Sequence, residues 1–188
     1  MTSSGPHDGP KIKGTGLQSV VSALRQRRDH AEPLLPEGLR HYLDDRLLVA
    51  SWYPEEDYYG LLRALAHFAP KAVRDAWDWM GATSARGDLS GIYAAMVQRN
   101  NPWATLQRLP RLWSLYHDTG RVDVGFQGEG RSQVLVWDYS FAHEHFCRLK
   151  GGYLRVMLEL AGAADPRVKV LRAGTAGHPA RWLISWTE

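Results

Sequence analysis

The spacing of apolar residues in this chain of 188 residues changes at Gly120. Before that glycine, apolar side chains recur every three to four positions, as on one face of an α-helix. After it, Val122, Val124 and Phe126 alternate with other residues, which is the period of a β-strand. A chain with helices first and strands afterwards is expected to fold as an α+β protein.

The first part of the helical segment contains two clear amphipathic stretches. Apolar residues from Leu17 to Leu24 follow helical spacing, and a short strand is expected just before them, at 11–14. A second helix is expected after Pro54, because proline and the following acids Glu55, Glu56 and Asp57 suit a first helical turn. Between these helices, the apolar run 46–52 predicts a strand or a buried turn.

Further helices are expected up to Gly120. One contains Trp77, and a separate one begins after Asp88, which is a suitable N-cap. Asn101 and Pro102 open the next in the expected order of cap and first-turn proline. Pro110 lies inside that pattern, so the helix either kinks there or divides into two short helices.

The remainder of the chain predicts a hairpin, a long helix and two more strands. The hairpin turns at 128–131, the helix covers 142–160, and the last strands are 168–171 and 182–186. We therefore expect an N-terminal helical half (15–119) packed on a C-terminal four-stranded antiparallel sheet of order β-β-α-β-β (121–187). Together they form a single domain, 11–188, after a flexible tail, 1–10.

Charge and cysteine content narrow the functional classes. The formal charge is only +3 and is spread along the chain, so nucleic acid is not an expected partner, although the run Arg25–Arg28 suits either a solvated helix end or an anion. With Cys147 as the only cysteine, no internal disulfide forms, which suits a reducing compartment. The N-terminus lacks an apolar leader and no stretch of about 18 apolar residues occurs, so a cytoplasmic protein without a membrane span is expected.

No strong catalytic or metal-binding motif is present. Nucleophile-elbow, dinucleotide, P-loop and zincin patterns are all missing, so we expect no enzyme and assign no catalytic residue. His143, His145 and Cys147 form the most suggestive polar cluster, with His178 as a further candidate. Residues two apart on a helix point in different directions, so a polar helix start is favoured over a metal site.

The aromatic residues of the helical half suggest a binding pocket. Its tryptophans and tyrosines either fill a core or line an apolar pocket between helices. His67 and His117 lie beside aromatic residues on predicted helices, where an imidazole would be a haem ligand or, more commonly, a half-buried histidine. The cofactor is left unassigned, and the candidate ligand-binding residues are Trp52, Tyr53, Tyr93, Trp113, Cys147, His67 and His117.

Several stretches in order resemble an uncharacterised family of about 180–200 residues found largely in myxobacteria. They are Lys13-Gly14-Thr15, Ser51–Pro54, Gly87–Tyr93 and Pro110–Gly120.

The C-terminal part also resembles the vinyl-4-reductase-type sensory domain, a distant relative of haem–nitric-oxide sensors and of TRAPP-like vesicle-tethering subunits. That resemblance implies helices on a four-stranded antiparallel sheet, often in a dimer, with a small molecule or acyl chain between the layers, and it places Cys147 near a pocket. Zinc-bearing members carry Cys-x-x-x-Gly-x-x-x-Cys; here Gly177 is present, but Ala173 and Arg181 replace the cysteines, which argues against a zinc site.

The sequence thus predicts a non-catalytic regulatory or signalling domain that binds a hydrophobic small molecule or a protein partner. The alternative is a protein-interaction or dimerisation scaffold with a filled core, and a haem- or metal-binding sensor is a weaker one. A cavity of a few hundred cubic ångströms would favour sensing, and a solid core would favour scaffolding.

Overall fold

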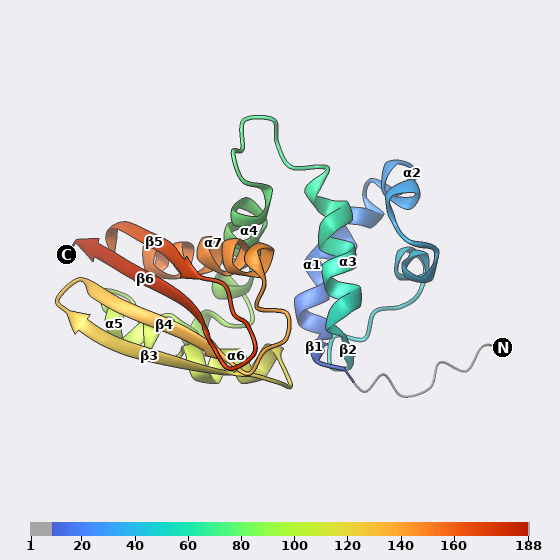
Figure 1. The fold of residues 1–188 in the computed structure, drawn as a ribbon. Helices are drawn as coiled ribbons and strands as arrows, with labels where there is room; N and C mark the ends of the chain where they lie inside the picture. The colour runs from blue at the N-terminus through green and yellow to red at the C-terminus, as the bar shows by residue number, and fades with distance from the viewer. Residues whose placement is uncertain (1–8, 188) are drawn as a thin grey trace. The chain divides into compact units, whose positions relative to one another are not determined.

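The computed structural model describes residues 9–187, which form seven α-helices and six β-strands (Figure 1). Their contacts divide into two compact units. The first extends to Phe68 and includes Leu115–Thr119, and the second contains Ala69–Ser114 and the chain from Gly120 onward. The predicted helical half is therefore divided between the units, and the single domain stays a prediction. Apart from Gly9 and Pro10, the predicted flexible tail lies outside the described residues.

Two helices and a small sheet build the first unit. Strand β1 (Lys11–Lys13) pairs antiparallel with β2 (Trp52–Pro54), and each strand continues directly into a helix. Those helices, α1 (Gly14–Arg25) and α3 (Glu55–Ala66), contact each other. The stripe predicted from helical spacing is the buried face of α1: Leu17, Val20, Val21 and Leu24.

The segment between α1 and β2 consists of short turns. It contains α2 (Arg28–Ala31) and two 3-10 helices, Glu32–Leu34 and Glu37–Leu43. The Arg25 guanidinium holds the end of the second one by donating to the carbonyl of Tyr42 at 3.1 and 2.9 Å.

The prediction of a strand or buried turn at 46–52 is wrong. Leu48 and Val49 are 51% and 41% exposed in a loop, and the strand begins only at Trp52. The loop carbonyls accept from the first amides of α1, so the backbone is satisfied without a strand: Gly14 donates to Ser51 at 2.9 Å and Thr15 to Val49 at 3.1 Å.

The second unit contains the predicted four-stranded antiparallel sheet, which confirms the α+β class. Its strands are β3 (Arg121–Gly128), β4 (Arg131–Trp137), β5 (Ala164–Arg172) and β6 (Ala180–Thr187), in the spatial order β3-β4-β6-β5. Alternate side chains of β4 and β6 form its buried inner face, as the period of two requires: Ser132, Val134 and Val136, then Ala180, Trp182, Ile184 and Trp186.

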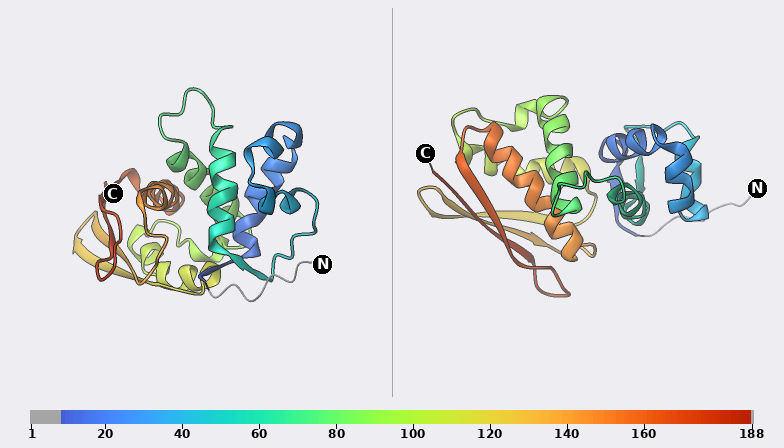
Figure 2. Two further views of the ribbon diagram at one scale, coloured as in Figure 1. Left: turned by 45° about the vertical axis from the view of Figure 1, so that its right-hand side comes forward. Right: turned by 90° about the horizontal axis from the view of Figure 1, so that it is seen from above.

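Helix α7 (Glu144–Leu160) lies across the inner face of the sheet (Figure 2). Its Phe146 packs edge-on against Trp182 at 5.8 Å between ring centroids, and the Trp182 indole donates to the Cys147 carbonyl at 3.0 Å. On its other side α7 packs along α4 (Ala76–Ser90). The two helices approach closely at Gly81 and Gly152, where an added Cβ would overlap a backbone carbonyl of the other helix.

The expectation of a helix break at Asp88 is wrong. Asp88 lies in the last turn of α4, and the N-cap of that helix is Asp75, whose carboxylate accepts from the amides of Trp77 at 2.9 Å and Asp78 at 3.3 Å. The predicted third helix is reduced to a 3-10 turn at Ala94–Met96. An N-cap residue itself has non-helical backbone angles, as Asp75 does with φ −135° and ψ 107°, whereas Asp88 lies within the helix.

At Pro110 the chain forms two short helices rather than one kinked helix. They are α5 (Pro102–Leu106), capped by Asn101 accepting from the Ala104 amide at 2.8 Å, and α6 (Leu109–Tyr116). Within residues 9–187, no helix has both the length and the apolar character needed to span a bilayer.

Candidate ligand-binding site

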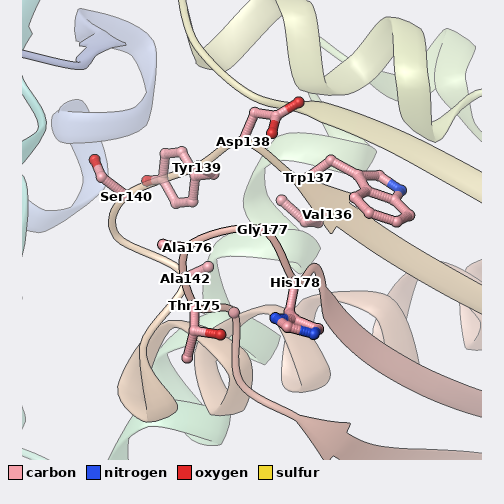
Figure 3. A pocket seen from close by; sticks show the side chains of 11 residues that line it. Val136, Trp137, Asp138, Tyr139, Ser140, Ala142, Thr175, Ala176, Gly177 and His178 are labelled. Carbon is pink, nitrogen blue, oxygen red and sulfur yellow. The ribbon is translucent and has the colours of Figure 1, made fainter.

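A cavity of about 430 Å³ lies at one end of the sheet in the second unit (Figure 3). This volume is within the range of small-molecule sites. One wall is the connection from β4 to α7 and the other is the connection from β5 to β6. The lining residues are Val136, Trp137, Asp138, Tyr139, Ser140, Ala142, Gly174, Thr175, Ala176, Gly177 and His178.

The first wall is a sharp bend where β4 ends. Asp138 has a φ of +54°, which non-glycine residues seldom adopt, and this turns the chain away from the strand. Tyr139 then enters the core, where its ring lies 5.0 Å from those of both Trp113 and Phe146. Because Tyr139 is only 6% exposed, core packing holds this wall in place.

The second wall is the tip of the β5–β6 hairpin. Thr175 and His178 exchange two backbone hydrogen bonds, of 3.0 and 2.9 Å, around a turn in which Gly177 has a φ of +75°. Glycine adopts this left-handed conformation at little cost. The Gly174 amide donates to the Ala142 carbonyl at 2.7 Å, which joins the two walls at the base of the cavity.

Cys147 lies behind the first wall and does not line the cavity. Its side chain is fully buried and its thiol donates to the Ala142 carbonyl at 3.8 Å. Burial raises the pKa of this thiol to about 12. The thiolate is the nucleophilic form, so at neutral pH Cys147 behaves as a small apolar side chain.

Trp137 supplies a polar group that lacks a partner. Its indole Nε1 is buried and has no hydrogen-bond partner among the described residues. The guanidinium of Arg121 lies 5.0 Å from the Trp137 ring centroid and also 3.6 Å from the Asp138 carboxylate. The Nε1 atom is screened from solvent, and Figure 3 draws it on the side of the ring that lies away from the other lining side chains, so it does not face the open cavity.

The candidate residues from the sequence do not line this cavity. In the first unit, Trp52 is 41% exposed with the Lys13 ammonium 4.4 Å above its ring, and the Tyr53 hydroxyl accepts from the Leu48 amide at 2.8 Å. His67 is exposed at the end of α3.

The other candidates lie in different surroundings. Trp113 and Cys147 belong to the core of the second unit, and Tyr93 is half-buried after α4. The many aromatic residues of the helical segment therefore do not mark the cavity, whose first wall follows β4. The signals for the cavity were Trp137 and Tyr139 directly after a strand, and the glycines of the stretch around Gly177.

Among the described residues of the first unit, Glu55 and His117 form a buried pair of ionisable groups. The imidazole Nδ1 of His117 lies 3.1 Å from Oε2 of Glu55, and both residues are buried. His117 follows α6 and bridges to Ile12 of β1, and the neighbouring Asp118 amide donates to the Lys11 carbonyl at 3.1 Å. Glu55 is thus both a helix-start acid, as predicted, and a partner for a distant histidine.

The predicted polar cluster at the start of α7 has structural roles. His143 is the N-cap of α7, and its side chain accepts from the Phe146 amide at 3.2 Å. The His145 ring stacks on that of Trp77 with 4.6 Å between the ring centroids. In the described part of the chain, no three His, Cys, Asp or Glu side chains come together as metal ligands would.

Comparison with known proteins gives a clear result for the fold. The chain matches no protein-family model and no curated protein sequence. Among solved structures, a variant of Tt H-NOX matches with a TM-score of 0.68 and 12% identity over 94% of this chain and 95% of that chain. A T. tengcongensis H-NOX variant matches with a TM-score of 0.69 and 11% identity, over 94% of this chain and 98% of that chain. An Fe(II) unliganded H-NOX variant from K. algicida matches with a TM-score of 0.65 and 10% identity, over 94% of this chain and 97% of that chain. The chain therefore has the H-NOX fold.

Proposed function

We propose that this protein is a non-catalytic sensory domain that binds a small, partly apolar molecule in the cavity between the β4–α7 connection and the β5–β6 hairpin. The single observation that carries the proposal is the cavity of about 430 Å³, which both apolar and polar residues line. The fold supports it, since one structural neighbour is described as an oxygen-binding H-NOX domain related to soluble guanylate cyclases. A cytoplasmic location and membership of the myxobacterial family stay predictions.

Haem is the ligand that the structural neighbours suggest, because two are described through haem distortion and haem redox potential. A haem iron needs an axial donor such as imidazole or thiolate beside an apolar slot. Both polar and apolar residues line this cavity, and its histidine, His178, is exposed at the tip of a hairpin. The nearby Cys147 thiol stays protonated, and His117 belongs to the other unit. The donor set of the cavity does not fit haem.

The lining instead suits a molecule with an apolar ring or chain and a polar group. Val136, Tyr139 and Ala142 supply apolar surface, and Thr175 and His178 supply polar side chains at the hairpin tip (Figure 3).

The test is binding of a panel of such compounds, followed by native mass spectrometry and thermal unfolding. A ligand that binds only the folded state stabilises it by about 2.7 kcal/mol at a concentration of a hundred times its Kd. Trp137→Phe shortens a side chain of the cavity wall and removes part of its apolar surface, so affinity is expected to fall by about tenfold. Trp103→Phe is the matched control, since Trp103 packs on Phe126 and does not line the cavity.

The proposal fails if no compound shifts the unfolding temperature, or if both tryptophan variants lose affinity equally. The same mass spectra distinguish the scaffold alternative. A dimer that carries no bound mass at any ligand concentration would support a dimerisation module in place of a sensor.

A further inference from the structure

The outer face of the second unit's sheet presents cations that have no acidic partner. Side chains alternate between the faces of a strand, so the residues between the buried ones of β4 and β6 point outward. Register places the neighbouring residues of β5 beside them. We call the following residues the outer basic face: Arg131, Gln133, Leu135, Lys169, Arg172, Arg181, Leu183 and Ser185.

Register also places Asp123 opposite Leu135 and Arg167 opposite Ser185 on this side of the sheet. Asp123 pairs with Arg121, and Arg167 pairs with Asp165, so neither changes the charge of the four cations named above. Arg131, Lys169, Arg172 and Arg181 are exposed and none of them lies within ion-pair distance of a described carboxylate. Arg172 and Arg181 face each other across β5 and β6, where like charges at such close range are destabilising.

The arginines of this pair are held in place by neutral acceptors only. Arg172 donates to the Pro179 carbonyl at 3.3 Å, and Arg181 donates to the side-chain oxygen of Gln133 at 3.0 Å. These bonds orient the guanidinium groups without reducing their charge. A bound carboxylate would neutralise the charge of a guanidinium group, because the two groups pair through two parallel hydrogen bonds.

Apolar side chains lie among these cations. Leu135 is directly opposite Arg181, and Leu183 is directly opposite Lys169. Both leucines are only half-buried although they lie on the two central strands of the sheet. An apolar centre with a charged rim rich in arginine is the usual composition of a protein–protein interface.

Two other anionic partners fit less well. Proteins that bind single-stranded nucleic acid stack bases on exposed aromatic rings, but the aromatic residue at this end of the sheet, Trp137, already has the Arg121 guanidinium over its ring. Proteins that bind membrane surfaces insert large apolar groups, whereas Leu135 and Leu183 are half-buried and lie among longer, exposed cations.

We propose that the outer basic face docks an acidic segment of a partner protein. Its carboxylates would pair with Arg131, Lys169, Arg172 and Arg181, and its apolar side chains would cover the two leucines. This proposal rests on the charge and register of the sheet and does not depend on the cavity.

The experiment measures binding of a labelled synthetic peptide of alternating Glu and Leu by fluorescence anisotropy at two salt concentrations. The double variant Arg131→Glu/Arg181→Glu is expected to weaken binding by about a hundredfold, or about tenfold for each charge pair lost. The matched control is Lys71→Glu/Arg99→Glu, which changes the net charge equally at exposed residues outside the sheet and should change affinity less than twofold. An all-Glu peptide should bind more weakly, because it leaves the leucines uncovered.

Three outcomes would overturn the proposal: no measurable binding of the peptide, equal loss in the two double variants, or tighter binding of an oligo-dT strand or of phosphatidylserine vesicles than of the peptide. Thermal unfolding of each variant checks that the substitutions leave the fold intact, which is expected because all four residues are exposed.

Discussion

The Nδ1 atom of His117 lies 3.1 Å from Oε2 of Glu55, with side chains that are 1% and 0% exposed. The two residues are 62 positions apart in the sequence. The contact therefore closes a long loop between the start of α3 and the residue after α6. A buried polar pair of this kind is costly to break because the remaining partner stays buried.

The first prediction concerns this pair. His117→Phe should lower the free energy of unfolding by about 3 kcal/mol, because it removes the imidazole from a buried carboxyl group. The double variant His117→Phe/Glu55→Leu should recover part of that loss, since no buried polar group is then left behind. Urea unfolding measures both values. His67→Phe, at an exposed histidine, is the control, and a loss as large as that of His117→Phe would show that the pair has no special role.

The second prediction concerns the close contact of α4 and α7. A Cβ at Gly152 would overlap the carbonyl oxygen of Asp78, and a Cβ at Gly81 would overlap that of Leu149. Backbone atoms cannot move aside without separating the helices, so Gly152→Ala should destabilise the fold by about 3 kcal/mol.

The neighbouring Gly151 is a matched control in the same helix. A Cβ there would meet only the Val168 side chain at 4.0 Å, which is ordinary contact. Gly151→Ala should therefore stabilise α7 by up to about 1 kcal/mol through helix propensity. Changes of the same sign and size in the two variants, measured by urea unfolding, would contradict the packing argument.

The third prediction concerns Cys147 and pH. Burial raises the pKa of its thiol from the ordinary value of 9.0 to about 12, so the folded state keeps a proton that the unfolded chain loses. The stability due to this thiol is fully present below pH 9 and is lost as the pH rises from 9 towards 12. Cys147→Ala should flatten this part of the stability profile measured by urea unfolding. An identical decline in the variant would assign the pH dependence to other groups.

The fourth prediction distinguishes the two possible caps around α4. Asp75→Ala should cost about 1 kcal/mol, because the amides of Trp77 and Asp78 lose their acceptor. Asp75→Asn keeps an acceptor oxygen and should restore most of the stability. Asp88→Ala should have a smaller effect, and a larger one, measured by thermal unfolding, would favour a second helix that begins there.

Secondary structure in this chain follows from local patterns of sequence. Val134 and Val136 alternate with less buried residues, and so do Trp182 and Ile184. This alternation predicts a half-buried strand, because a strand buries one of its two faces whichever strands lie beside it. Asn101 was likewise predictable as a helix cap, because capping depends on the asparagine and the few residues that follow it. The prediction of a cap at Asp88 failed because many aspartates are suitable in type, and the backbone conformation of the aspartate itself decides which one caps a helix.

The candidate site was not predictable in this way. Its walls come from the segments around Tyr139 and Gly177, which meet only because β4 and β6 are paired in the sheet. The seven residues chosen from the sequence have aromatic, thiol or imidazole side chains. Most of the aromatic ones contact residues near them and do not line the cavity.

By itself, the sequence determined α1, α3 and α7, the four strands of the larger sheet and the alternation of their buried and exposed side chains, since these depend on residues a few positions apart. Only the tertiary structure decided that Glu55 meets His117, that α4 and α7 touch at two glycines, and that cations from three strands share one face. Such contacts depend on where whole elements lie, and short-range periodicity carries no information about that.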